Sequence, residues 1–469
     1  MYDTTRLLCA AAYLDRRFTD HVVRRVLREE LRAVAPSFGV DIVPVVRHCL
    51  AAQRRRLLRD TMLVLVAASW FLMVRFGADL ISAGIQVLLL AWGVVFLAAC
   101  LDRYQILAGF FPGRFDPGTA PEPATRKQSR LLAELGRNET GNVTVYSGFR
   151  PFVGAGVAGE SWSFTTDLRK GREDFDVVHE PRPFEVDDLY AHLGKALREL
   201  DLDGLDVHHR LFVNGQDIRR QSWVLPDPLR RPVSVVEPGW IQQYLRTPTH
   251  QVRHYLVAQL VDWSGELVVS IFLRFARTGS CLVSEAAYFV LPPLWERYHA
   301  VDRLRPGADV RNALRMVART ALQAPFLLLL SPFTVGARLL EPAALFLERR
   351  EIRRQIRSDM LFDYGAATSV RELGTAPGYR RYFQMLDHSA YVKLLDHAVL
   401  NAVIDFLDEH DIDTSDLKER QSVIQNNGVI VSGGGSLQAQ SMAVGKGAKA
   451  RAKQARDRVK VPTRKGGSR

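Results

Sequence analysis

The chain has 469 residues, enough for two or three domains, and 47% of them are hydrophobic, with a mean hydropathy of −0.06. This average excludes a polytopic transporter, which would be far more apolar, and indicates that most of the chain faces water. The net charge is +12, and residues 446–469 carry ten Lys or Arg against one acid, Asp457. Such a basic disordered tail favours an anionic partner, either acidic lipid headgroups or nucleic acid. The alternative is a solvated tail without a partner.

Cysteine usage and the N-terminal sequence favour a reducing cytosol. The four cysteines are too far apart for a CxxC zinc site or a disulfide scaffold. Residues 1–23 interleave acids and bases and have no apolar core, so no signal peptide is expected. The cysteines are Cys9, Cys49, Cys100 and Cys281.

Residues 1–60 are predicted to form amphipathic helices. Apolar side chains recur at helical spacing over 4–33, with arginines between them, and Pro36 and Gly39 end this helix. A second helix is predicted over 42–59. It ends in a basic cluster formed by Arg54, Arg55, Arg56 and Arg59.

Residues 61–101 are predicted to form a transmembrane helical hairpin. The run 61–74 has no charge, Arg75 and Asp79 flank a short break, and 80–101 is a second uncharged run. A bilayer core needs about 20 apolar residues in helical form. Basic residues beside a membrane segment stay on the cytoplasmic side, and two spans return the chain to the side it left. We therefore expect a multi-pass plasma-membrane protein whose N- and C-terminal regions are cytosolic.

The next stretch is predicted to be a linker followed by a cytosolic α+β domain. Residues 102–139 are rich in Pro and Gly and include a short helix. Residues 140–306 combine alternating strand patterns with a helix over 185–200, and Asn214-Gly215 predicts a hairpin turn.

Residues 307–357 allow two interpretations. The run 320–337 has no charge and would suffice for a third span, but Pro325 and Pro332 interrupt it and arginines flank it on both sides. Crossing would place one basic cluster outside, so we favour an interfacial helical segment on the inner leaflet.

The C-terminal part is predicted to be helical over 358–425. A short Gly-rich β segment over 426–445 follows, too small to be stable unless it pairs with a partner or with copies of itself. The fold class expected from the whole chain is therefore α+β.

The most explicit motif is G-x-G-x-x-G at Gly154, Gly156 and Gly159. A dinucleotide site needs such a turn between a strand and a helix, whose N-terminus holds the pyrophosphate. Here a strand pattern follows, so a flexible loop is expected, although its backbone amides would still suit a nucleotide-like ligand.

Three other groups of side chains each have an ordinary structural interpretation. Adjacent residues of a strand point to opposite faces, so the neighbouring His208 and His209 are poorly placed to bind the same metal ion. The acidic group lacks EF-hand spacing and is typical of a solvated helix end. The aromatic group would suit base stacking but more often forms a core. These groups are His179, His192, His208 and His209; Asp408, Glu409, Asp411 and Asp413; and Trp162, Trp223, Trp240 and Trp263 with Phe149 and Phe152. No catalytic, cofactor-binding or metal-binding residue is predicted.

Several phrases carry a resemblance to a known group: NVTVYSGFRPFVGAGVAGESWSF at 142–164, DYGAATSVRE at 363–372, YFQMLDHSAYVKLL at 382–395 and NNGVIVSGG at 426–434. Through them the chain resembles uncharacterised integral membrane proteins of actinobacteria. The resemblance implies a membrane location and no known activity.

The sequence thus predicts a plasma-membrane-anchored interaction, scaffold or regulatory protein in preference to an enzyme. Its partners would be the lipid bilayer, an anion at the basic tail, and a protein or a second copy at 426–445. The alternative is a membrane-attached enzyme or a signalling or defence effector acting on a nucleotide-like ligand at the glycine loop.

Overall fold

The computed structural model describes residues 3–77, 79–139, 141–174, 177–303, 310–358 and 360–426. This part of the chain is α+β, which confirms the predicted fold class. The chain divides into two compact units, Met1–Ile412 and Asp413–Arg469. The described part of the second unit is a short lead-in and α11 (Ser415–Asn426). The predicted β segment over 426–445, except Asn426, and the basic tail over 446–469 lie outside the described residues.

The N-terminal helix predicted over 4–33 is wrong in its continuity. The structure has α1 (Asp3–Leu14), α2 (Arg16–Val22) and a π-helical turn, η1 (Val23–Arg28). Asp15 breaks the helix because its backbone is extended, and its carboxylate accepts the backbone N–H groups of Arg17 and Phe18 at the start of α2. The chain thereby folds α1 and α2 onto the first long helix, around a core that contains Leu7, Leu8 and Val22.

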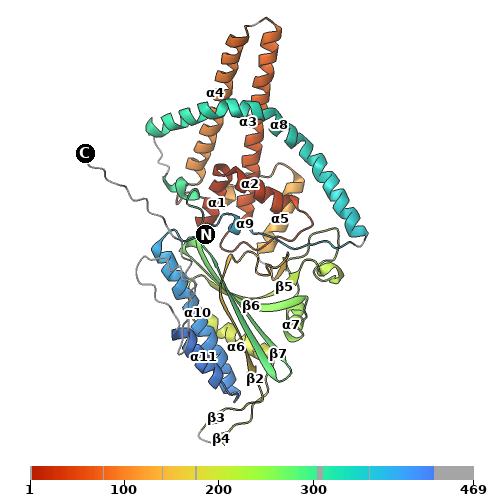
Figure 1. Cartoon of the computed structure of the whole chain (residues 1–469), viewed down its shortest axis with the longest axis vertical. Helices are drawn as coiled ribbons and strands as arrows, with labels where there is room; N and C mark the ends of the chain where they lie inside the picture. The colour runs from red at the N-terminus through yellow and green to blue at the C-terminus, as the bar shows by residue number, and fades with distance from the viewer. Residues whose placement is uncertain are drawn as a thin grey trace, which may run out of the picture. The chain divides into compact units, whose positions relative to one another are not determined.

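The two apolar runs form longer helices than the sequence predicts. The helix expected over 42–59 and the first run join in α3 (Ile42–Arg75), because the arginines at 54–59 are good helix formers and nothing between them interrupts the backbone hydrogen bonds. The second run belongs to α4 (Leu80–Gly109), so the irregular linker begins near residue 110 rather than 102. Figure 1 shows α3 and α4 side by side, extending away from the sheet.

One six-stranded sheet organises the rest of the first unit, in the order β1-β5-β6-β7-β8-β2. β1 runs parallel to β5, and all the other neighbours are antiparallel. The strands are β1 (Val143–Tyr146), β2 (Val157–Asp167), β5 (Leu205–Asn214), β6 (Val252–Asp262), β7 (Leu267–Thr278) and β8 (Cys281–Leu291). A separate two-stranded ribbon joins β3 (Glu173–Asp174) and β4 (Val177–Val178).

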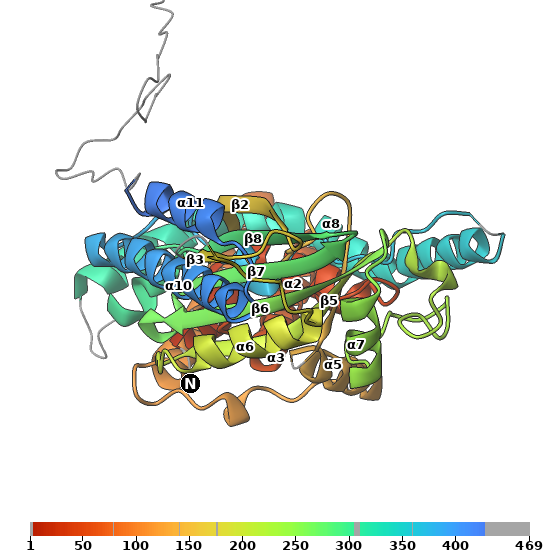
Figure 2. The same cartoon turned by 90° about the horizontal axis from the view of Figure 1, so that it is seen from below.

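Helices cover one face of this sheet. Figure 2 shows α6 (Val186–Arg198) and α10 (Tyr382–Glu409) in front of the strands. The buried side of α6 presents Tyr190, whose hydroxyl accepts the backbone N–H of Phe275 at 2.8 Å. On the opposite face, Phe152 packs among Phe212 and Phe272 in an aromatic cluster.

The remaining elements connect these parts. They are η2 (Pro117–Thr119), α5 (Arg126–Glu139), η3 (Ile218–Arg220), α7 (Pro238–Arg246), η4 (Trp263–Gly265), η5 (Tyr298–Arg303), α8 (Val310–Arg357) and α9 (Val370–Leu373). In Figure 1, α1 and α2 lie between one end of the sheet and α8.

Candidate functional site

The most distinctive surface of the molecule is apolar and is formed by three long helices. Among the described residues, α3, α4 and α8 are each long and apolar enough to cross a membrane. Large side chains near the tip of the α3–α4 hairpin are open: Phe76 is 85% exposed, Ile81 72% and Phe71 68%. Water would not stabilise such a surface, and its size marks a contact with lipid or with another apolar surface.

α8 crosses the hairpin and packs against both of its helices (Figure 1). Ala324 of α8 shares a buried cluster with Leu63 of α3 and with Ala91 and Val95 of α4. The indole N–H of Trp92 donates to Thr320 Oγ1 at 3.2 Å. The hairpin and α8 therefore form one packed group of helices.

The prolines within 320–337 do not end the helix, contrary to the expectation that they interrupt it. Pro325, Pro332 and Pro342 all lie inside α8, which runs for 48 residues. A proline removes one backbone hydrogen bond and bends a helix, while the turns on either side keep theirs. Figure 1 shows α8 changing direction along its length.

The G-x-G-x-x-G loop is held by the protein itself. The amides of Gly154 and Gly156 donate to Glu372 Oε1 at 2.9 Å and 3.2 Å. Both glycines have positive φ, and a Cβ on them would collide with the carbonyl oxygens of Pro36 and Val290 respectively. The loop thus needs glycine for close packing, and the two amides that a phosphate would use already have an acceptor.

The segment 363–372 acts as a clasp for this loop and the adjoining strand. Asp363 accepts the Ser147 hydroxyl at 2.5 Å, and Ala366 forms a parallel bridge with Tyr146. Ser369 and Glu372 form a capping box at the start of α9, so one carboxylate serves both the helix and the loop. The S-x-x-E spacing was the signal in the sequence that would have identified this cap.

Arg371 is a residue that sequence reasoning missed. Its side chain is fully buried, and its Nη2 donates to the carbonyl oxygens of Glu266 and Pro292, both at 2.9 Å. Its Nη1 donates to Thr375 Oγ1 at 2.6 Å. Burial lowers the pKa of Arg371 to about 10. Its hydrogen bonds join α9 to the ends of β7 and β8, which is a structural role.

The adjacent histidines His208 and His209 have different partners. His208 Nδ1 lies 2.8 Å from Asp206 Oδ2, whereas His209 Nδ1 lies 2.9 Å from Nε2 of His254, a residue that the sequence did not single out. Burial lowers the pKa of His254 to about 3, so this pair is neutral at physiological pH. No group of three or more His, Cys, Asp or Glu suited to a metal occurs among the described residues.

The acidic and aromatic groups are parts of the packing. Asp411 Oδ2 accepts Arg182 Nε at 2.8 Å, just after the end of α10. The indoles of Trp162 and Trp263 donate to Asp396 and Asp387 of α10 at 2.8 Å and 3.0 Å. Trp223 and Trp240 stack on each other. Phe152 lies in the core, while Phe149 is 100% exposed.

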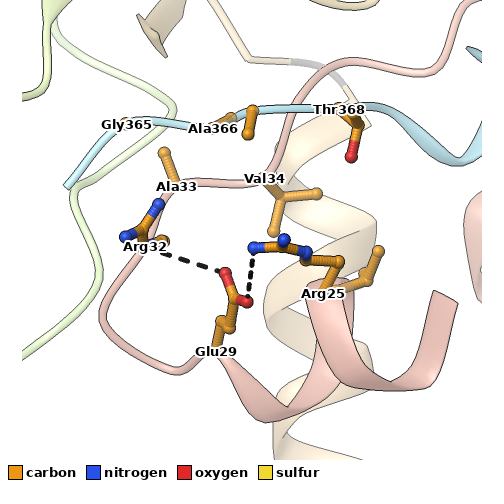
Figure 3. Close-up of a pocket in the computed structure, with 10 residues that line it drawn as sticks. Arg25, Glu29, Arg32, Ala33, Val34, Gly365, Ala366 and Thr368 are labelled. Carbon is orange, nitrogen blue, oxygen red and sulfur yellow. Dashed lines mark hydrogen bonds and ion pairs between the residues drawn. The ribbon is translucent and has the colours of Figure 1, made fainter. Parts of the chain in front are cut away.

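A small cavity lies between η1 and the clasp segment (Figure 3). Its polar wall is a row of ion pairs, with Glu29 between Arg25 and Arg32 at 3.0 Å and 3.8 Å. Ala366 and Thr368 lie opposite. The volume of about 20 Å³ holds one or two water molecules, which is too little for a substrate.

Comparison with known proteins identifies one family. A family model, described as an AbeC-like domain, matches residues 161–439, which is more than half of the chain. This region begins in β2 and includes α8, whereas α3 and α4 precede it. No curated protein and no solved structure matches the chain. The chain belongs to the family of proteins with an AbeC-like domain.

Proposed function

We propose that this protein is a membrane-anchored interaction or scaffold protein that holds its AbeC-like domain at the cytosolic face of the plasma membrane. The observation that carries the proposal is the open apolar surface of the α3–α4 hairpin, because in water such a surface would cause the protein to aggregate. The same helix α3 continues into the N-terminal core, where Ile42, Val45 and Cys49 are buried. The anchor and the folded domain would therefore move together.

Both ends of the hairpin lie on one side of it, so the chain on either side of the anchor shares one compartment. The basic cluster at Arg54–Arg56 and Arg59 favours the cytosol for that compartment. The lipid bilayer is the first partner in this proposal. Anionic headgroups or nucleic acid would bind the basic tail over 446–469, and a protein or second copy would bind 426–445.

Alkaline carbonate extraction tests the anchor. We expect the full chain to stay in the membrane pellet, because apolar helices resist a treatment that removes peripheral proteins. A matched variant in which residues 67–90 are replaced by a short Gly-Ser turn should move to the supernatant. Release of the unaltered chain by carbonate would contradict the proposal.

Deletion of 426–469 tests the interaction role. We expect the truncated chain to remain in the membrane and to lose either its self-association or its co-purifying partner. A control deletion limited to the basic tail, 446–469, separates the two segments. Unchanged oligomer size and unchanged partner recovery in the longer deletion would exclude the role proposed for 426–445.

A further inference from the structure

The two sides of α8 differ in chemistry. On one side, Thr334 donates to Asp60 at 3.2 Å and Arg338 pairs with Asp20 at 2.9 Å. Glu341 pairs with Arg28, so this side is tied to the N-terminal helices. The other side carries large apolar residues with no cover from the described part of the protein. Their exposed fractions lie between 64% and 76%, and they recur every three or four residues: Leu322, Phe326, Leu329 and Phe333.

Charges at the ends of α8 suit an anionic membrane surface. Arg315 and Arg319 precede the apolar stripe on exposed positions of the helix. Exposed arginines follow it at 350, 353, 354 and 357. A helix with one apolar side and basic flanks lies in the plane of the interface, with its apolar side in the acyl chains. Because α8 packs directly on both helices of the hairpin, one bilayer would cover the stripe and the hairpin together.

The crossing point of α8 sets how far the hairpin reaches. α8 meets α3 at Leu63 and α4 at Ala91. From Leu63 to Arg75, α3 rises about 18 Å, and α4 covers a similar length from Leu80 to Ala91, at about 1.5 Å per residue. A hydrocarbon core is about 30 Å thick. With α8 at the near interface, the hairpin ends close to the middle of the bilayer.

We propose that α8 lies in the inner-leaflet interface and that the α3–α4 hairpin enters the bilayer from that side without emerging on the far side. The protein is then monotopic, although α3 and α4 are each long enough to span. This inference rests on the proposed membrane anchor and refines it. At the tip, the carboxylate of Asp79 accepts the backbone N–H groups of Ile81 and Ser82 at the start of α4. Charged groups inside a membrane are tolerated where the protein supplies such partners.

Cysteine labelling at the tip tests the depth. Cys9 and Cys49 are fully buried and remain in place, while the half-buried Cys100 and Cys281 are replaced by Ala. Phe76→Cys then reports the tip, and Phe149→Cys reports the fully exposed surface of the sheet domain. The full-length variants are expressed in bacteria and treated with a membrane-impermeant maleimide as spheroplasts, as inverted membrane vesicles and in detergent.

We expect Phe76→Cys to react only in detergent, and Phe149→Cys to react in inverted vesicles and in detergent. Reaction of Phe76→Cys in intact spheroplasts would show a hairpin that spans and would overturn the inference while leaving the anchor. Reaction of both variants in inverted vesicles without detergent would show a hairpin outside the bilayer. That result would overturn the inference together with the proposed function.

A second measurement tests the placement of α8. A fluorophore on Leu329→Cys, in the apolar stripe, is compared with one on the exposed neighbour Gln323→Cys, outside that stripe. In vesicles with anionic lipid, we expect a lipid-soluble nitroxide to quench residue 329 several-fold more than residue 323. Equal quenching at the two positions, or free access of iodide to residue 329, would contradict an interfacial α8.

Discussion

At the scale of single residues, the carboxylate of Glu372 joins three parts of the chain. It caps α9 and accepts both amides of the glycine loop, which in turn lies against Pro36. The sequence predicted a strand after the glycine pattern, and β2 confirms it. It could not reveal Glu372 as the acceptor, since 218 positions separate Gly154 from this carboxylate in the chain.

Glu372→Ala should lower the free energy of unfolding by about 2 kcal/mol, because one hydrogen bond to a charged group is worth roughly 1.5–3 kcal/mol. Urea unfolding of the detergent-solubilised protein measures the change. The matched control is Glu160→Ala, an exposed residue of β2. Equal stability of the two variants would refute the structural role of Glu372.

The His209–His254 pair predicts a loss of stability in mild acid. The pKa of buried His254 is about 3, below the 6.5 of an unfolded histidine, so the unfolded state binds the proton first as the pH falls. The contribution of neutral His254 to the free energy of unfolding is therefore fully present above about pH 6.5. Below that pH it declines, by up to about 1.4 kcal/mol per pH unit.

Thermal unfolding between pH 7.5 and pH 5 checks this dependence. His254→Gln should flatten the decline, whereas substitution of the exposed His250 by Gln should leave it unchanged. A decline that is equally steep in His254→Gln would mean that other groups cause it.

At the scale of elements, α10 is fixed to the sheet by carboxylates. Asp396 accepts the indole N–H of Trp162 at 2.8 Å and the hydroxyl of Tyr288. Burial and the neighbouring Asp396 raise the pKa of Tyr288. The periodicity of the sequence predicted a helix in this region but could not show that β2 and β8 would supply its partners.

Asp396→Ala should destabilise the protein by about 2 kcal/mol, because the buried hydroxyl of Tyr288 and the half-buried indole of Trp162 lose their acceptor. It should also change the fluorescence of Trp162, whose half-buried indole would become more accessible to water. Asp405→Ala, at an exposed position of the same helix, is the control. A variant with unchanged stability and unchanged fluorescence would show that α10 is held by its apolar contacts alone.

Element boundaries were less predictable than element types. Hydropathy located both long apolar helices, but the arginines at 54–59 that were expected to end a helix lie inside α3. Likewise, the prolines at 325 and 332 bend α8 without ending it. In both places contacts with distant residues, such as Asp60 with Thr334, favour a helix that local sequence would divide.

At the scale of the whole molecule, the apolar hairpin and the AbeC-like domain differ in how far the sequence predicts them. The two helices of the hairpin can be recognised from composition alone, because crossing a bilayer core requires about 20 apolar residues whatever their order. The sheet pairs β1 with β5 and places β2 beside β8, and these distant pairings do not follow from any local pattern. The sequence accordingly predicted the class α+β without predicting the strand order.

The central claim is that a hairpin anchors the chain and leaves the regions on either side of it in the cytosol. Topology reporters fused after Gly118 and, in a separate fusion protein, after Gly435 test this claim directly. The account predicts cytosolic reporter activity at both positions. An external signal at Gly435 alone would mean that α8 crosses the membrane, and an external signal at Gly118 would contradict the hairpin itself.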